Sequence, residues 1–404
     1  MITRLALRNL WRHRRRTLLT MGALAVGVMA VVSVRGFLNG LQGSLITGVT
    51  EGGFGALQIH ATGFMASVEA MPLSPDLPGD DAALSAVEDI DGVASVAPRL
   101  TFPARLAGEH DSTFALVVGA DLAREALVSP RRVQLVTSGT WPAGDTVHTS
   151  AVVGSELLGG LRLQLGRRAA VLGSDIDGVM NGVEVNVAGG VAAATQGEKR
   201  LVIIPLEKAQ ELIRRPGRVT EYAVAIDDGA DVDVVADAVR RAMGPSVEVH
   251  TWPELMPFVR DAKSTQDGVL RVVTGALLFV IMMGLANTLL MSVFERTREI
   301  GTLLALGMKR RLVMHLFVLE GVLLGIGGAV IGDVLGTIIV TIAGRAGIAL
   351  TPPGASIPQV IVPAIGPSFL IAMVAGAAIG AAIASLSPAW RASRLDPVSA
   401  LADR

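Results

Sequence analysis

The sequence of 404 residues contains no cysteine and only four lysines. Without cysteine the chain has no disulfide framework, thiolate nucleophile or cysteine-ligated metal site, and it can cross an oxidising compartment with no thiol at risk. It has no G-x-x-x-x-G-K-[ST] sequence and none of the lysines follows a glycine, so it holds no P-loop for ATP. The G-x-S-x-G signature of serine hydrolases is also absent.

Candidate metal ligands are few and scattered. The six histidines are His13, His60, His110, His148, His250 and His315. They include no pair at positions i and i+4, so a histidine-rich metal site is not supported. Asp175 and Asp177 form a D-x-D pair, but no glutamate follows at the EF-hand spacing, and we interpret the pair as a solvated turn. The sequence predicts no enzyme activity in this chain.

Long uncharged segments are the main feature that is present. Apolar residues make up 51% of the chain and charged residues 18%, which excludes an intrinsically disordered protein. Uncharged runs long enough to cross a bilayer predict four spans, within residues 17–34, 272–294, 312–344 and 368–386. Prolines between residues 346 and 366 exclude a helix interior there. For the first run we favour an uncleaved span over a signal peptide, because no convincing A-x-A site follows.

The charges are unevenly distributed, although the formal net charge is only −1. Residues 36–270 contain 18 basic and 30 acidic residues, whereas the rest of the chain contains 17 basic and 6 acidic residues. The basic residues flank the predicted spans, before the first, between the second and third, and in the tail. By the positive-inside rule, both termini are cytoplasmic and the acidic segment is external. Binding to nucleic acid is not expected, because the basic residues are not on the folded middle segment.

The segment of about 230 residues between the first two spans has the composition of a soluble domain. Strands are predicted at 55–60, 93–97, 114–119, 201–205 and 222–226, and helices at 82–88, 206–213 and 232–243. Residues 135–190 predict a mostly β insertion. The pattern indicates an α+β domain whose two ends come together. Residues 36–50 and 257–270 are predicted to extend the first two spans as a helical stalk.

A short charged segment joins the second and third predicted spans. Residues 287–320 read NTLLMSVFERTREIGTLLALGMKRRLVMHLFVLE. Glu295 and Arg298 are three residues apart and are predicted to pair on one helix face. Gly301 and Gly307 bracket a small apolar surface. The segment is either a solvated connector or a docking site for a cytoplasmic partner, since an exposed apolar patch rimmed by charge commonly binds another molecule.

This segment, the beginning ITRLALRNLWRHRRRTLLT and the end SPAWRASRLDPVSAL resemble the FtsX/MacB-like ABC permeases. Segments 151–166, 201–213 and 250–258 are similar to the external domain of that family. The E-R-T-R-E-I-G-x-x-x-A-x-G pattern is the most specific motif, and the resemblance covers the whole order of one span, a large external domain and three further spans. The family includes lipoprotein-releasing, macrolide-exporter-type and cell-division permeases. The lipoprotein-releasing (LolC/LolE-type) branch looks most similar.

The resemblance implies that the segment after the second span is a coupling helix seated on an ATPase. The residues that match the family motif are Glu295, Arg296, Arg298, Glu299, Gly301, Ala305 and Gly307. No cofactor is expected in this chain, since ATP and Mg²⁺ would be bound by a separate cytoplasmic ABC ATPase dimer. A second permease copy or paralogue, membrane lipids and a lipoprotein or other periplasmic partner are the further contacts implied. Such permeases work by mechanotransmission, in which ATP-driven closure moves the spans and the stalk.

Small residues and two carboxylates lie inside the predicted spans. Small residues recur at Gly321, Gly325, Gly328, Gly332, Gly336, Ala372, Gly376, Gly380 and Ala384. Such spacing lets helices approach closely, either within the chain or at a dimer interface. Glu320 and Asp333 are unfavourable in a membrane unless they are paired or near its surface. We expect a structural or gating role for Glu320, whereas Asp333 is either involved in coupling or protonated or hydrogen-bonded within the bundle.

Together these features predict an α-helical membrane protein with four transmembrane helices and a large α+β extracytoplasmic domain inserted between helices 1 and 2. The predicted parts are an amphipathic cytoplasmic segment (1–16), helix 1 (17–37), the external domain with its stalk (38–267), helix 2 (268–294), the coupling loop (295–311), helix 3 (312–344), an external loop (345–366), helix 4 (367–387) and a cytoplasmic tail (388–404). We expect a permease of the bacterial inner membrane that extracts or releases lipoproteins. The alternatives are export of a small molecule or peptide by a tripartite pump, and regulation of a cell-wall hydrolase.

Overall fold

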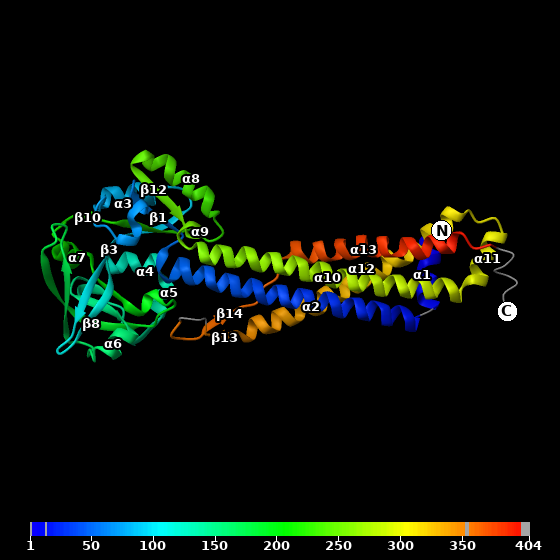
Figure 1. Ribbon diagram of the computed structural model, residues 1–404, viewed down its shortest axis with the longest axis horizontal. Helices are drawn as coiled ribbons and strands as arrows, with labels where there is room; N and C mark the ends of the chain where they lie inside the picture. The colour runs from blue at the N-terminus through cyan, green and yellow to red at the C-terminus, as the bar shows by residue number, and fades with distance from the viewer. Residues whose placement is uncertain (1, 13, 352–354, 397–404) are drawn as a thin grey trace. The chain divides into compact units, whose positions relative to one another are not determined.

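The computed structural model describes residues 2–12, 14–351 and 355–396 (Figure 1). The predictions that concern His13, the prolines at 352 and 353, and the tail from residue 397 lie outside the described residues. The chain divides into two compact units. One contains Met1–Gly43, Ala262–Ile348 and Val360–Arg404, and we call it the helical unit. The other contains Ser44–Asp261 and Ala349–Gln359, and we call it the external domain.

Four helical segments are long and apolar enough to cross a membrane within the described part of the chain. They are α2 (Arg14–Val49) with the π-helical turn η1 (Thr50–Phe54), α10 (Pro257–Glu295), α12 (Arg310–Ala346) and α13 (Pro367–Ser393). A short helix, α1 (Ile2–Arg12), precedes them, and α11 (Thr297–Ala305) connects α10 to α12. The predicted stalk segments are helical, because α2 runs to Val49 and α10 begins at Pro257.

Within the helical unit, α12 packs against α13, where Gly321 and Gly325 lie beside Ser385 and Ala381. α13 continues through Pro388 to Ser393, past the predicted end of the fourth span. This extension is stabilised by burial, because Ala389 and Ala392 pack in a cluster with Ile300 of α11 and Phe317 of α12. Between α12 and α13, the strands β13 (Ile348–Leu350) and β14 (Gln359–Ile361) form a two-stranded sheet.

A ten-stranded sheet forms the framework of the external domain, and its strand order is β12-β1-β11-β3-β4-β9-β6-β8-β5, with β7 paired to both β3 and β8. The strands are β1 (Leu57–Ala61), β3 (Val93–Ala107), β4 (Ser112–Ala120), β5 (Val136–Gly139), β6 (Ser150–Gly154), β7 (Arg168–Ser174), β8 (Met180–Val191), β9 (Leu201–Pro205), β11 (Glu221–Ile226) and β12 (Val247–Thr251). β2 (Leu77–Pro78) pairs separately with β10 (Arg218–Val219). Because β1 pairs with both β11 and β12, the two ends of the domain meet as predicted.

The two largest hydrophobic clusters of the external domain cover different parts of this sheet. The first joins β1, β11 and β12 to α3 (Asp81–Glu88) and α8 (Val232–Met243). The second joins β3, β4 and β6 to β9 with α7 (Leu206–Ile213). The residues of α7 and α8 coincide with the predicted helices, and β5 to β8 confirm the mostly β insertion.

Short helices and 3₁₀ turns connect the strands of the external domain. The helices are α4 (Leu122–Val128), α5 (Pro130–Gln134), α6 (Ser155–Gly160) and α9 (Trp252–Leu255), and the 3₁₀ turns are η2 (Met65–Ala70), η3 (Gly144–His148), η4 (Gly197–Arg200) and η5 (Gly244–Ser246). Aspartates cap three of the domain's helices, as N-cap side chains that accept backbone N–H bonds commonly do. These caps are Asp80 at α3, Asp121 at α4 and Asp231 at α8. The four membrane-crossing helices and this α+β domain confirm the predicted fold class.

Candidate functional site

The helices of the helical unit meet at a charged junction. α10 ends at Glu295, Arg296 leaves helical geometry with φ −108° and ψ 15°, and α11 begins at the next residue. α1, the start of α2 and α12 contribute to the same region. We call the network of side chains there the junction cluster, and its members are Asn9, Arg12, Arg16, Glu295, Arg296, Glu299 and Glu320.

Arg296 lies at the centre of the junction cluster and is only 7% exposed. Its Nη1 donates to both carboxylate oxygens of Glu320, at 3.2 and 3.4 Å, and its Nε donates to Glu299 at 3.1 Å. The Nδ2 of Asn9 donates a further hydrogen bond to Glu320 at 2.7 Å. The Arg296 guanidinium also lies 5.6 Å from the ring centroid of Phe317. These contacts explain how α12 accommodates a buried carboxylate, since such a group needs a counter-charge and hydrogen bonds.

Two outer ion pairs connect the N-terminal helices to the same junction. Arg16 of α2 donates to Glu295 at 2.8 Å, and Arg12 of α1 lies 3.0 Å from Glu299. The predicted pairing of Glu295 with Arg298 is therefore wrong. The helix is interrupted at Arg296, so residues 295 and 298 do not share the continuous helical geometry that brings i and i+3 side chains together.

α11 presents one face to the bundle and another to its surroundings. Ile300 and Gly301 are buried, and Leu304 packs against the same cluster as Ile300. Arg298 and Ala305 are exposed, and Leu306 is 80% exposed. The residues predicted for coupling therefore separate into two groups. Arg296 and Gly301 fix α11 to the bundle, whereas the exposed residues leave an apolar surface beside charged groups.

Gly307 ends α11 in a conformation that favours glycine. Its φ is +90°, and its N–H donates to the carbonyl of Leu304 at 3.0 Å. The N–H of Met308 donates to the carbonyl of Leu303, also at 3.0 Å. These two bonds form a Schellman motif, in which the left-handed residue that follows the helix is usually glycine. The structure thus gives Gly307 a backbone role in setting the end of α11.

The glycines of α12 and α13 that the sequence predicts for helix packing lie against other helices of the same chain. A Cβ added at Gly325 would lie 2.6 Å from the Cβ of Ala381 in α13, and one at Gly332 would lie 2.6 Å from the carbonyl oxygen of Ala25 in α2. Gly321 meets α13, Gly328 and Gly336 meet α2, and Gly380 and Gly376 meet α10. These small residues permit close approach between helices, because a larger side chain would separate the two backbones.

Replacing Gly332 by valine should destabilise the packing of α2 on α12 by about 1–3 kcal/mol, the usual effect of overpacking a tight interior. Gly275→Val in α10 is the matched control, because a Cβ at Gly275 would meet nothing within 4 Å. Thermal unfolding of the detergent-solubilised chain measures both effects. Equal melting temperatures for the two variants would show that α2 and α12 do not depend on this close contact.

Asp333 is a buried carboxylate of α12 that differs from Glu320. Its Oδ1 has no hydrogen-bond partner among the described residues, and neither has the hydroxyl of Thr337, one turn further along the helix. The chain around these groups is apolar, with Val28 and Val32 of α2 against the neighbouring glycines. The structure therefore shows partners for Glu320, whereas a role of Asp333 in coupling stays a prediction.

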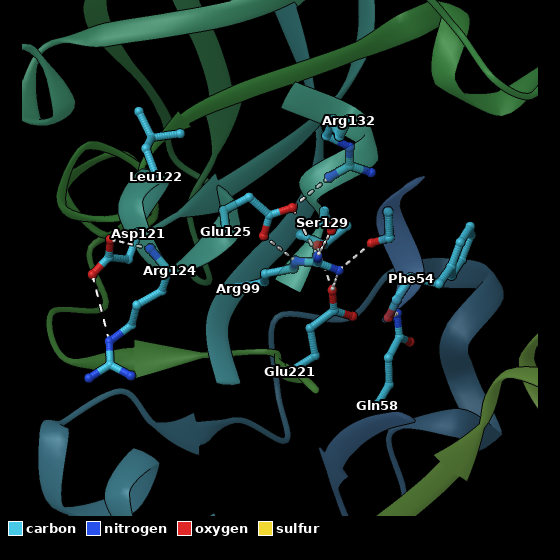
Figure 2. Close-up of polar contacts among 12 residues, drawn as sticks. Phe54, Gln58, Arg99, Asp121, Leu122, Arg124, Glu125, Ser129, Arg132 and Glu221 are labelled. Carbon is cyan, nitrogen blue, oxygen red and sulfur yellow. Dashed lines mark hydrogen bonds and ion pairs between the residues drawn. The ribbon is translucent and has the colours of Figure 1, made fainter. Parts of the chain in front are cut away.

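A second charged cluster, which the sequence pattern does not predict, lies buried in the external domain (Figure 2). Arg99 of β3 is only 2% exposed and forms a bidentate pair with Glu125 of α4, at 2.8 and 2.9 Å. Its Nη1 donates to the backbone carbonyl of Gly53, and Glu221 lies 3.8 Å away on β11. Burial alone would lower the pKa of Arg99, but the charges of Glu125 and Glu221 hold it above its ordinary value.

Arg132 of α5 completes this cluster. Its Nη1 donates to Glu125 at 2.7 Å, and its Nη2 lies 3.5 Å from Glu198. A Cβ at Gly53 would lie 2.0 Å from the Arg132 guanidinium, so any larger residue there would displace this guanidinium. Gly53 belongs to η1, the turn that directly follows α2. We call Gly53, Arg99, Glu125, Arg132, Glu198 and Glu221 the arginine cluster. The one feature of the sequence that could have indicated this cluster is Arg99. It is the only charged residue between Asp91 and Arg105, in an otherwise apolar segment.

The scattered histidines and the D-x-D pair have different surroundings. Asp175 accepts backbone N–H bonds from Asp177 and Val179, at 3.0 and 2.8 Å, which confirms the turn. The prediction that the pair is solvated is wrong for Asp175, because its side chain is buried. Burial acts against ionisation of Asp175, but these bonds and Asn181 hold its pKa below the ordinary value. The ring centroids of His60 and His250 are 5.9 Å apart, a proximity that their sequence positions did not predict. Across residues 2–12, 14–351 and 355–396, no group of three or more acidic and histidine side chains is arranged to hold a metal ion.

Two protein families match the chain. Residues 17–242 match the MacB-like periplasmic core domain, and residues 271–397 match the FtsX-like permease C-terminal domain. The first match alone covers more than half of the chain, and together the two follow the predicted order of an inserted domain and a C-terminal set of spans.

Curated relatives agree with these matches. The macrolide export ATP-binding/permease protein MacB of Sodalis glossinidius is 28% identical over 98% of this chain and 60% of its own length, and that of Nitrobacter winogradskyi is 25% identical over 96% and 58%. The chain thus spans about three fifths of the length of these relatives. An uncharacterized ABC transporter permease of Methanocaldococcus jannaschii is 27% identical over 36% of this chain and 37% of its own.

Two solved structures are similar to part of the chain. The periplasmic region of MacB from Actinobacillus actinomycetemcomitans has a TM-score of 0.37 and 13% identity, over 52% of this chain and 92% of that one. The extracellular domain of the noncanonic ABC-type transporter YknZ from Gram-positive bacteria has a TM-score of 0.35 and 12% identity, over 48% and 99%. From the family matches, the chain belongs to the ABC permeases that combine a MacB-like periplasmic core domain with an FtsX-like permease C-terminal domain.

Proposed function

We propose that this chain is the permease subunit of an ATP-driven transporter that works by mechanotransmission. The observation that carries this proposal is the continuity of α2. The helix contains Arg16 of the junction cluster in its first turn, and it passes directly into η1, where Arg99 donates a hydrogen bond to the carbonyl of Gly53. A helix with charged contacts near each end can transmit a displacement, because a shift of either end would break the hydrogen bonds made there.

The ATPase would bind at α11. Leu306, Ala305 and Arg298 form an exposed surface there, and the chain itself has no P-loop. In this proposal, ATP and Mg²⁺ are bound by a separate cytoplasmic ABC ATPase dimer. A second permease copy or a paralogue would complete the assembly. The basic residues that flank the spans favour the inner membrane with both termini in the cytoplasm and the external domain in the periplasm.

Lipoprotein extraction or release is the substrate assignment we favour, on the resemblance of the motifs. Export of a small molecule through a tripartite pump is the second candidate, and the relatives named as macrolide exporters favour it. The two differ in what stimulates the ATPase. A reconstituted complex that is stimulated by a triacylated lipoprotein supports the first, whereas stimulation by erythromycin alone supports the second. A complex stimulated by neither, but held tightly to a cell-wall hydrolase, would indicate a regulator.

Replacing Leu306 by lysine should reduce stimulation of the cognate ATPase about tenfold or more, the effect of disrupting a central apolar contact in an interface. Lysine in the last turn favours the helix dipole, so α11 itself should persist. Leu127→Lys is the matched control, since Leu127 is 66% exposed in the last turn of α4. We expect Glu299→Arg and Gly307→Val to act in the same direction as Leu306→Lys. If Leu306→Lys stimulates the cognate ATPase as strongly as the wild type does, the ATPase does not dock at α11.

A further inference from the structure

α1 is a basic helix that packs within the helical unit through one of its faces. Ala6 is fully buried, and Leu10 packs in a cluster with apolar side chains of α10, α12 and α13. The other face carries Arg4, Arg8 and Trp11, which are exposed, Trp11 to 81%. Because residues three and four apart lie on the same side of a helix, these three side chains form one exposed stripe.

Most of the positive charge in this segment has no counter-charge. Arg12 and Arg16 pair with glutamates of the junction cluster. Four other exposed arginines have side chains that form no ion pair or hydrogen bond with any residue that the structure describes, and these are Arg4, Arg8, Arg14 and Arg15. The first 50 residues contain no aspartate or glutamate, so the segment cannot neutralise itself. We call Arg4, Arg8, Trp11, Arg14 and Arg15 the basic surface.

The contacts of α1 place the basic surface at the level where the membrane-crossing helices become charged. The uncharged run of α2 begins after Arg16 and that of α10 ends before Glu295, and these two residues pair at 2.8 Å. Glu320 marks the same level on α12, because it accepts hydrogen bonds from Asn9 of α1 and from Arg296, which directly follows α10. The headgroup region of a bilayer begins where the uncharged parts of the spans end, so α1 lies at the level of the headgroups.

The residue types of the basic surface suit phosphate groups at this level. An arginine guanidinium can bind two phosphate oxygens through parallel hydrogen bonds. Tryptophan is enriched at the boundary between hydrocarbon and headgroups, because its ring is apolar and its N–H is polar. Clusters of basic residues directly beside a membrane-crossing helix attract anionic lipids. Charge and position therefore both favour lipid as the partner of this surface.

We propose that the basic surface binds the headgroups of anionic phospholipids in the leaflet beside α1, with its arginines on the phosphates and Trp11 at the hydrocarbon boundary. The bound headgroups supply the counter-charge that this segment lacks, and they hold α1 at the bilayer surface beside the junction cluster. This binding goes beyond the proposed function, because it requires neither the ATPase nor a transported substrate.

The selectivity of the chain for spin-labelled lipids measures this binding. The full chain is reconstituted in phosphatidylcholine vesicles with a trace of spin-labelled phosphatidylglycerol or phosphatidylcholine, and electron spin resonance separates lipid held at the protein from bulk lipid. We expect the wild type to bind phosphatidylglycerol at least about threefold more tightly than phosphatidylcholine. Replacing Arg4, Arg8 and Arg15 together by glutamine, which preserves helix propensity, should remove most of this preference.

The matched control replaces Lys309, Arg310 and Arg311 by glutamine, which also removes three exposed charges from the helical unit. Arg310 begins α12 and lies about 15 Å along that helix from Glu320, which exceeds the screening length of about 10 Å in about 0.1 M salt. This control should therefore keep most of the preference. Equal losses in the two variants would show that no site on α1 selects the lipid.

A wild-type chain that binds the two lipids equally would overturn the proposal. If the variant of Arg4, Arg8 and Arg15 then also loses binding to the cognate ATPase, the basic surface contacts that subunit instead of lipid.

The surroundings of Trp11 give a second test that leaves the arginines intact. Replacing Trp141, Trp252 and Trp390 by phenylalanine leaves Trp11 as the one tryptophan. In phosphatidylcholine vesicles, a small fraction of brominated phosphatidylglycerol should quench its fluorescence about twofold or more as strongly as the same fraction of brominated phosphatidylcholine. A chain that keeps Trp141 alone, in the external domain, should show no such difference. Equal quenching of Trp11 by the two lipids, or quenching by neither, would contradict anionic lipid binding at α1.

Discussion

Replacing Glu125 by alanine should destabilise the external domain by about 3–5 kcal/mol, the effect of removing one partner from a buried ion pair. Glu125 is fully buried and is the shared acceptor of Arg99 and Arg132. Its removal leaves two guanidinium groups inside the domain without their main counter-charge. We expect the end of α2 to loosen as well, because Arg99 also holds the carbonyl of Gly53.

Urea unfolding of the full chain in detergent, followed by tryptophan fluorescence, measures this effect, since Trp141 and Trp252 both lie in the external domain. Glu184→Ala is the control, because the Glu184–Arg168 pair is exposed on both sides and such pairs contribute about 0–1 kcal/mol. If Glu125→Ala unfolds at the same urea concentration as Glu184→Ala, the arginine cluster does not stabilise the domain.

Replacing Arg296 by methionine should destabilise the helical unit by about 3–5 kcal/mol, because Glu320 then stays buried without a counter-charge. Methionine keeps much of the side-chain volume, so loss of charge rather than a cavity is tested. The second variant, Arg296→Met with Glu320→Gln, should recover most of the loss, since a neutral amide needs no counter-charge and Asn9 can still hydrogen-bond to it.

Thermal unfolding of the wild type, Arg296→Met and the double variant in lipid nanodiscs measures these differences in stability. Stimulation of the cognate ATPase by each protein gives a second readout. We expect Arg296→Met to lose stimulation together with stability, because α11 is attached to α12 through this pair. A double variant no more stable than the single one would show that Arg296 acts through packing on Phe317 and not through the charge of Glu320.

The sequence was sufficient to predict those helices that depend on local residue patterns. The amphipathic period of residues 232–243 and their N-cap Asp231 predict α8, and the long uncharged runs predict the four apolar helices. The strand predicted at 93–97 was too short, because β3 runs on to Ala107 through Pro98 and Pro103. A proline normally interrupts a strand, but here both hold regular positions opposite Tyr222 and Leu116.

The candidate sites were predictable to different degrees. The coupling segment could be found because its residues are contiguous, and a family motif fixes their spacing. Its partners could not, because Arg16 and Glu295 are separated by most of the chain and come together only through helix packing. The arginine cluster was missed for the same reason, since Gly53, Arg99 and Glu221 lie on segments that only the sheet brings together.

The central claim, that the chain transmits ATP-driven motion from α11 to the external domain, can be tested by one distance measurement. Because the chain has no cysteine, Leu127→Cys in the external domain and Ile331→Cys in α12 give two specific spin-label sites, each at an exposed side chain. Electron–electron double resonance then gives the distance between the labels in the complex with the cognate ATPase. Our account predicts that trapping the ATPase with ATP and vanadate shifts this distance, and that Leu306→Lys abolishes the shift. A distance that is unchanged by ATP, or a shift that persists in Leu306→Lys, would contradict it.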